Sequence, residues 1–109
     1  MHLPLQAQCV RVPVLVGHAQ AIWVETAEPL SVGGARDVLG AAPHVALQDF
    51  ATPSDAAGRD EVLVGRVRSD TASGSGLALW SVNDNLRKGA ALNAVQIAEA
   101  LLERRLIPV

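Results

Sequence analysis

Half of the 109 residues of this chain are hydrophobic and 18% are charged, which is the composition of one small globular domain. The formal net charge of -2 provides no broad cationic field, and this argues against electrostatic binding of nucleic acid or of an acidic membrane surface. No segment reaches the about 18 apolar residues of a membrane helix, and the N-terminus lacks the pattern of a signal peptide. We therefore expect a cytoplasmic protein.

The first part of the chain predicts two short strands and a helix. Residues 8–25 are rich in β-branched and apolar side chains, and Pro13 and Gly17 divide them into two strands with a bend between them. Ser31 is placed to cap a short helix, and Gly40 is placed to end it.

The middle of the chain predicts a strand, a surface loop and a β-hairpin. Residues 45–50 suit a third strand, and the turn-forming residues 51–58 suit a loop. Residues 61–70 and 77–83 have the pattern of paired strands, which the Gly- and Ser-rich residues 71–76 connect.

The clearest predicted element is a helix over residues 89–106. Its polar residues form one narrow stripe, made of Asn93, Gln96, Glu99 and Glu103. A helix on the surface of a small domain usually has one apolar face, so this helix requires burial on two sides. The apolar strand 77–82 has the same requirement. The order of elements, without a repeated βαβ unit, predicts an α+β fold in which helices pack on a mostly antiparallel sheet.

Two polar residues near the first predicted strand are candidates for a functional site. Arg11 lies in an apolar segment, where a guanidinium either faces a carboxylate or phosphate or is solvated on an edge strand. His18 follows the bend at Gly17, and histidine is the side chain best suited to moving protons near neutral pH. From the pattern alone, a solvated loop histidine is the more common outcome. In one continuous strand, residues seven apart lie about 23 Å apart on opposite faces. Arg11 and His18 can therefore share a site only if the chain folds back.

A third candidate segment, residues 84–91, leads into the last helix. Asp84 or Asn85 would cap the helix, and the free N–H groups at such an end attract anions. Arg87 and Lys88 oppose the helix dipole at this position. A bound phosphate or carboxylate would offset this conflict, and full solvation of both cations is the alternative.

Cysteine and histidine usage indicates no metal site. A single cysteine, Cys9, can form neither an internal disulfide nor a thiolate cage, and the three histidines lack the close spacing of metal ligands. Because Cys9 has apolar neighbours and no local cluster of positive charge, we expect its thiol to be buried and inert.

These segments resemble the C-terminal part of aspartate-semialdehyde dehydrogenases. Residues 9–18 (CVRVPVLVGH) are similar to the family segment that carries a substrate-binding arginine and a catalytic histidine at the same seven-residue separation. Residues 65–68 (GRVR) resemble the strand that follows, and residues 84–97 (DNLRKGAALNAVQI) resemble the family's C-terminal signature. The resemblance runs from about residue 9 to residue 102.

The resemblance implies a two-domain enzyme that reduces aspartyl 4-phosphate to aspartate 4-semialdehyde with NADPH, in the biosynthesis of lysine, threonine and methionine. It implies that Arg11 binds the substrate carboxylate, that His18 is the acid/base, and that Asn85 contacts NADP. It also implies a partial C-terminal domain of the glyceraldehyde-3-phosphate dehydrogenase type. The partner would be a second copy in a homodimer, or a complementing N-terminal dehydrogenase chain.

The chain departs from the family's full pattern. The family's nucleophilic cysteine and glycine-rich dinucleotide loop lie before the segment that resembles residues 1–109, and Cys9 does not take the nucleophile's place. We therefore expect the C-terminal portion of the catalytic and dimerisation domain, without a dinucleotide-binding domain and inactive alone. A related non-catalytic dimerisation module is the alternative, followed by an unrelated small binding protein. Arg11 and His18 favour the enzyme, because dimerisation requires neither.

Overall fold

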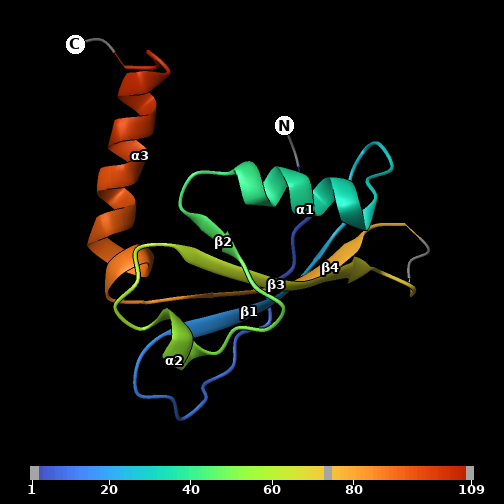
Figure 1. The fold of residues 1–109 in the computed structure, drawn as a ribbon, viewed down its shortest axis with the longest axis horizontal. Helices are drawn as coiled ribbons and strands as arrows, with labels where there is room; N and C mark the ends of the chain where they lie inside the picture. The colour runs from blue at the N-terminus through green and yellow to red at the C-terminus, as the bar shows by residue number, and fades with distance from the viewer. Residues whose placement is uncertain (1–2, 73–74, 108–109) are drawn as a thin grey trace.

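The computed structural model describes residues 3–72 and 75–107, and its elements are shown in Figure 1. In chain order they are β1 (His18–Val24), α1 (Val32–Ala41), β2 (Val45–Leu47), α2 (Pro53–Ala56), β3 (Val62–Ser69), β4 (Leu77–Asn83), a short π-helical turn (Arg87–Ala91) and α3 (Leu92–Glu103).

The strands form one sheet in the order β1-β4-β3-β2, so that β1 and β2 are its edges within the described residues. β4 pairs antiparallel with both of its neighbours, which confirms the predicted hairpin and the α+β class. β2 and β3 are parallel, so the sheet is mixed rather than purely antiparallel. Parallel neighbours need a long connection, and residues 48–61, with α2 among them, provide it.

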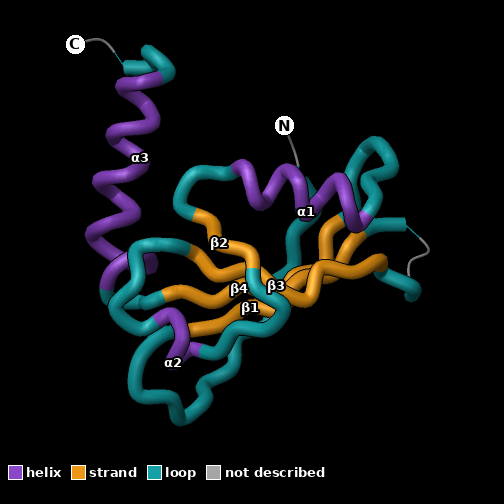
Figure 2. Tube along the Cα trace, in the orientation of Figure 1, coloured by secondary structure: helices purple, strands orange, loops and turns teal. Residues whose placement is uncertain are grey.

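The core lies on both faces of the sheet, as Figures 1 and 2 show: α1 covers one face and α2 lies against the other. On the first face, Ala35 of α1 packs with a cluster of buried residues: Val64, Val67 and Leu77. On the second, the buried residues are Ala51, Ala56, Leu63 and Val82. The predicted burial of β4 on both faces is therefore confirmed.

Helix α1 begins and ends close to where its sequence signals predict. The Ser31 hydroxyl accepts a hydrogen bond from the Gly34 N–H at 3.0 Å and so caps the helix. The helix ends at Ala41, one residue beyond Gly40.

The segment after β2 contains a helix where only a loop was expected. β2 ends at Leu47, so the predicted strand over residues 45–50 is too long. α2 follows with a capping box, in which the side chains of Thr52 and Asp55 bond each other's backbone N–H, and with Pro53 at its first position. These are readable helix-start signals, and the prediction of a loop over residues 51–58 overlooked them.

The strand predicted before Gly17 does not form. Residues 3–17 have no regular structure, because no neighbouring strand in the described chain supplies hydrogen-bond partners to them. Their apolar side chains are exposed: Val10 is 79% accessible and Val12 56%. The prediction of a buried Cys9 thiol is also wrong, since Cys9 is exposed in this segment.

Helix α3 stands away from the rest of the molecule (Figure 1). It begins at Leu92 rather than at residue 89, because the backbone at Ala90 (φ -139°, ψ -123°) interrupts the helix, and it ends at Glu103 rather than at residue 106. None of its residues is buried, and Val95 and Ile97 are 54% and 52% exposed. The predicted need for burial on two sides is thus unmet by the part of the chain that the structure describes. Among the described residues, no helix has the length and apolar character needed to cross a membrane.

Candidate functional site

The sheet topology brings two of the three candidate segments together. In the antiparallel pairing of β1 with β4, His18 at the start of β1 lies opposite Asn83 at the end of β4. The bend at Gly17 and the turn at Asp84 and Asn85 therefore lie at the same end of the sheet, although they are far apart in sequence.

A hydrogen bond joins these two segments directly. The Gly17 N–H donates to Oδ1 of Asn85 at 2.7 Å. Gly17 has φ +88°, which favours glycine, and a Cβ at this position would lie 3.0 Å from the Pro53 carbonyl oxygen of α2. The bend that precedes His18 is thus fixed between α2 and the turn that carries Asn85.

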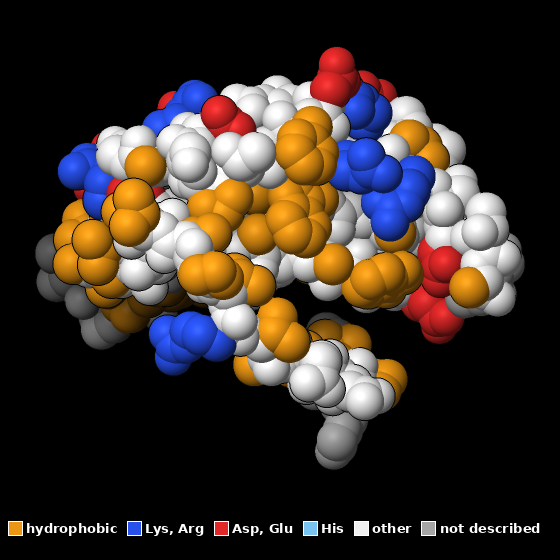
Figure 3. All heavy atoms as spheres, turned by 90° about the horizontal axis from the view of Figure 1, so that it is seen from below, with side chains coloured by type: hydrophobic (Ala, Val, Ile, Leu, Met, Phe, Trp, Pro, Cys, Tyr) orange, Lys and Arg blue, Asp and Glu red, His pale blue; other side chains and the backbone are white. Residues whose placement is uncertain are grey.

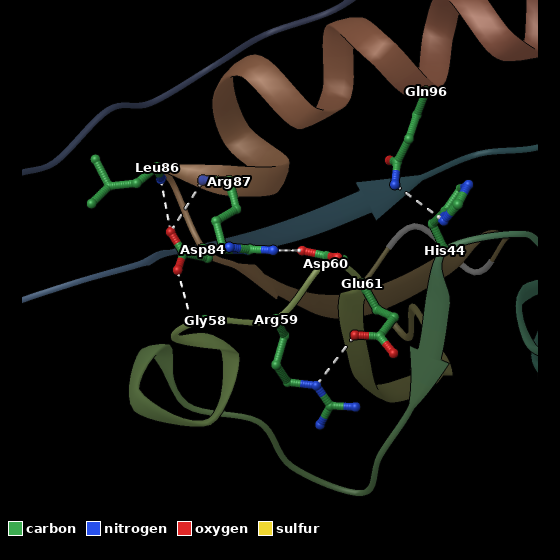
Figure 4. A network of polar contacts seen from close by, with 9 residues as sticks. All are labelled: His44, Gly58, Arg59, Asp60, Glu61, Asp84, Leu86, Arg87 and Gln96. Atoms are coloured by element: carbon green, nitrogen blue, oxygen red, sulfur yellow. Dashed lines mark hydrogen bonds and ion pairs between the residues drawn. The ribbon is translucent and has the colours of Figure 1, made fainter.

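Asp84 is the buried acidic group of the site, with 4% of its surface exposed. Its Oδ2 accepts from the Gly58 N–H at 2.7 Å, and its Oδ1 accepts from the N–H groups of Leu86 at 2.8 Å and Arg87 at 3.3 Å (Figure 4). The hydrogen bond from Gly58, followed by that from Leu86, holds the pKa of the carboxyl below its ordinary value. Of the two predicted caps, Asp84 rather than Asn85 binds the free N–H groups of this turn.

The two cations after this turn have internal partners. The Arg87 guanidinium donates to Oδ1 of Asp60, and the distance from Nε to this oxygen is 2.7 Å. Both side chains are about half exposed. Lys88 donates to Oε1 of Gln96. The amide nitrogen of Gln96 lies 3.2 Å from Nδ1 of His44 (Figure 4). Asp60 is therefore a carboxylate of this chain that offsets the charge of Arg87 near the helix N-terminus, whereas the partner of Lys88 is a neutral amide.

Arg11 is not joined to the other candidates. It is exposed in the irregular segment, and within the described residues its guanidinium has no hydrogen bond or ion pair. The shared site of Arg11 and His18 stays a prediction, since the structure establishes only the adjacency of His18 and Asn85.

The surface next to the bend is hollowed. An open hollow of about 450 Å³ lies between the irregular segment and α2, lined by Pro13, Val14, Leu15, Val16, Ser54 and Ala57. His18 and Asn85, on the adjoining bend and turn, are both exposed. Such an arrangement can exchange a proton through the imidazole and donate hydrogen bonds through the amide. In the described part of the chain, no group of three or more His, Cys, Asp or Glu side chains gathers as metal ligands would.

Sequence reasoning missed the contribution of α2 to this site. Pro53 packs against Gly17 at the bend, and Gly58 donates to Asp84 in the turn after β4. Helix α2 and its following turn therefore support both the bend and that turn. The capping box of Thr52 and Asp55 would have revealed the helix, but nothing in the sequence indicates its contact with Gly17.

Comparison with known proteins identifies the family. Residues 1–88 match the family described as semialdehyde dehydrogenase, dimerisation domain. The chain belongs to this family. The aspartate-semialdehyde dehydrogenase of Streptomyces akiyoshiensis is 56% identical over 97 residues, which are 89% of this chain and 29% of that protein. The enzyme of Aquifex aeolicus is 47% identical over 112 residues, with 97% of this chain and 33% of that protein covered.

Solved semialdehyde dehydrogenases have the same fold over this segment. Aspartate semialdehyde dehydrogenase II of Vibrio cholerae, solved in complex with ASA, has a TM-score of 0.76 and 51% identity, covering 84% of this chain and 29% of that one. A probable aspartate-semialdehyde dehydrogenase of Pseudomonas aeruginosa has a TM-score of 0.72 and 40% identity, and the match covers 83% of this chain and 28% of that one. The chain therefore spans about a third or less of the length of these dehydrogenases.

Proposed function

We propose that this chain supplies the acid/base part of an NADP-dependent aspartate-semialdehyde dehydrogenase site. His18 is the acid/base, Arg11 binds the substrate carboxylate, and Asn85 contacts the cofactor. The reaction reduces aspartyl 4-phosphate to aspartate 4-semialdehyde with release of phosphate, in the biosynthesis of lysine, threonine and methionine. The adjacency of His18 and Asn85, in a chain that matches this family over residues 1–88, carries the proposal.

The chemistry of each residue suits its proposed role. The exposed imidazole of His18 takes a proton from the attacking thiol and returns it later in the reaction. The planar guanidinium of Arg11 binds a carboxylate through two parallel hydrogen bonds. NADP, when bound, exchanges a hydride with the substrate. Oδ1 of Asn85 accepts from Gly17, and the NH₂ group of the same amide can donate to an acceptor on the cofactor. The described residues provide no other partner for this NH₂ group.

The remaining groups of the site come from another part of the dehydrogenase. We assign residues 1–109 to the C-terminal portion of its catalytic and dimerisation domain, so the nucleophilic thiol and the dinucleotide-binding domain are supplied by a preceding segment or a complementing chain. We do not assign Cys9, which is exposed in the irregular segment, as the nucleophile, because the family resemblance places that thiol in the preceding segment. A cytoplasmic location stays a prediction.

Exposed apolar side chains support assembly into a homodimer. Trp23, on the edge strand β1, is 63% exposed, and Val24 beside it is 39% exposed. Figure 3 shows hydrophobic side chains gathered across the middle of one face of the molecule. Such contiguous apolar surface is typical of protein interfaces.

A non-catalytic dimerisation module is the second candidate function. The lack of a hydrogen-bond partner for Arg11 among the described residues favours it, as does the description of the matched family as a dimerisation domain. The two candidates differ in one respect that can be measured, which is whether His18 is needed for turnover.

A hybrid enzyme tests the proposal. Residues 1–109 replace the matching segment of the Vibrio cholerae dehydrogenase, to which this chain is 51% identical. The hybrid is first shown to be folded and dimeric by circular dichroism and light scattering. Phosphate- and NADP-dependent oxidation of aspartate semialdehyde is then measured. We expect His18→Ala to lower kcat by about 100-fold or more, the usual effect of losing a general acid/base, and His44→Ala to leave kcat unchanged. Near-normal kcat in the His18 variant refutes the assigned role, and a folded hybrid without activity favours the dimerisation module.

A further inference from the structure

We propose that Asn85 is a positioning residue for His18, in addition to its proposed contact with the cofactor. Its side-chain oxygen ties the backbone immediately before His18 to the turn that precedes the last helix. This inference rests on the proposed function, because it assumes that His18 transfers protons.

The bond from Gly17 to Asn85 continues the pairing of β1 with β4 by one residue. The backbone ladder begins at His18, which lies opposite Asn83, so the Gly17 N–H falls just outside it. Oδ1 of Asn85 takes the place of a strand carbonyl and accepts this N–H at 2.7 Å. The identity of the accepting atom follows from chemistry, because a backbone N–H can bond only to the oxygen of the amide.

Asn85 is itself held firmly by its neighbours. The buried carboxylate of Asp84 accepts the N–H groups of Gly58 and Leu86, and the Asp84 carbonyl oxygen accepts the Gly89 N–H at 2.9 Å. The backbone on both sides of Asn85 is thus fixed by hydrogen bonds. A side chain on such a turn can hold another segment at a defined place.

The opposite side of the bend is limited by α2. A Cβ on Gly17 would lie 3.0 to 3.2 Å from three atoms of Pro53, so the bend already lies against the helix. Movement of the bend toward α2 is blocked by this contact, and movement away from Asn85 breaks the hydrogen bond. His18 follows Gly17 directly, so fixing the bend also fixes the position of the imidazole. Proton transfer requires the imidazole at a defined position.

The two ends of the Asn85 amide therefore have separate tasks. The oxygen positions the bend, and the NH₂ group can donate to a ligand. Asn85→Asp retains an acceptor of the same shape and removes the donor, whereas Asn85→Ala removes both. The pair of variants separates positioning from ligand binding.

The first experiment measures the bend in the 109-residue chain, without any need for activity. NMR records the exchange of the Gly17 amide with water in the parent chain, Asn85→Ala, Asn85→Asp and the control Asn93→Ala, whose asparagine lies on α3. We expect about fivefold faster exchange of Gly17 in Asn85→Ala, the effect of losing one hydrogen bond, and parent-like exchange in the other two variants. Unchanged exchange in Asn85→Ala overturns the proposal.

The second experiment measures kinetics in the hybrid enzyme. We expect Asn85→Ala to lower kcat about tenfold or more and to raise KM for NADP, whereas Asn85→Asp keeps kcat within about threefold and raises KM alone. If both variants raise KM with equal kcat, Asn85 binds only the cofactor and the positioning role is refuted. If the folded hybrid is inactive while Gly17 exchange responds as expected, the proposed function fails and the structural tie between Asn85 and the bend stands.

Discussion

Replacing Gly17 with alanine tests whether α2 and Asn85 together fix the bend before His18. Two costs follow from the structure. At φ +88° an alanine is strained by about 1 to 2 kcal/mol, and its Cβ meets Pro53 at 3.0 to 3.2 Å, a contact that forces backbone atoms apart. Overpacking of this kind costs about 1 to 3 kcal/mol.

Gly58→Ala provides the matched control for this substitution. Gly58 has φ +78°, close to that of Gly17, but a Cβ at Gly58 meets no atom within 4 Å. The backbone strain is therefore common to the two variants, and the difference between them measures the contact with Pro53. We expect Gly17→Ala to be less stable than Gly58→Ala by about 1 to 3 kcal/mol, or about 5- to 150-fold in the unfolding equilibrium.

Urea denaturation followed by circular dichroism measures this difference, and NMR exchange of residue 17 shows whether its N–H still bonds to Asn85. We expect faster exchange in Gly17→Ala, because the bend must move away from α2. Equal stability of the two alanine variants would show that Pro53 yields without cost, and the reasoning that α2 holds the bend would then be wrong.

Three further predictions concern the turn before the last helix, the end of α3 and the exposed apolar surface. Hydrogen bonds, first that from Gly58, lower the pKa of Asp84, so its carboxylate stabilises the fold fully above about pH 5 and progressively less as the pH falls below the ordinary value of 3.8. We expect Asp84→Asn to have a lower Tm than the parent chain at pH 7, and we expect this difference in Tm to become smaller toward pH 3. A difference in Tm that is constant with pH contradicts the stabilising role of the Asp84 carboxylate. Arg105 has φ +54° in a Schellman motif at the end of α3, where Leu106 N–H bonds the Leu101 carbonyl at 2.9 Å. Arg105→Gly should relieve about 1 kcal/mol of strain and increase helicity at 222 nm, whereas Arg105→Ala should not. The isolated chain should associate in light scattering or bind a hydrophobic dye, because Val95 and Ile97 of α3 are about half exposed; a monodisperse monomer that binds no dye would contradict this.

The parts of the fold that sequence reasoning predicted correctly depend on local signals. Ser31 caps α1 because its hydroxyl lies three residues before a free N–H. The hairpin of β3 and β4 forms because apolar strands flank a Gly- and Ser-rich connection, and the burial of β4 on both faces follows from its apolar residues on both sides.

The errors have equally specific causes. The strand expected around Val10 and Val12 needs a neighbour to complete its hydrogen bonds, and a period-2 pattern does not say whether that neighbour is present. The capping box that starts α2 consists of residues that also favour turns, so the segment was predicted as a loop. The geometry of the site was the hardest part to predict. Gly17 and Asn85 are 68 residues apart, so their hydrogen bond depends on the β1–β4 register and not on any local motif.

The position of β1 at the edge of the sheet connects assembly with chemistry. One side of β1 pairs with β4, and its other side offers backbone groups to an incoming strand, with the exposed Trp23 near its far end. His18 is the first residue of this same strand. A second polypeptide that extended the sheet here would run alongside the imidazole, so a change in how subunits meet would reach the proton-transferring group through a single strand.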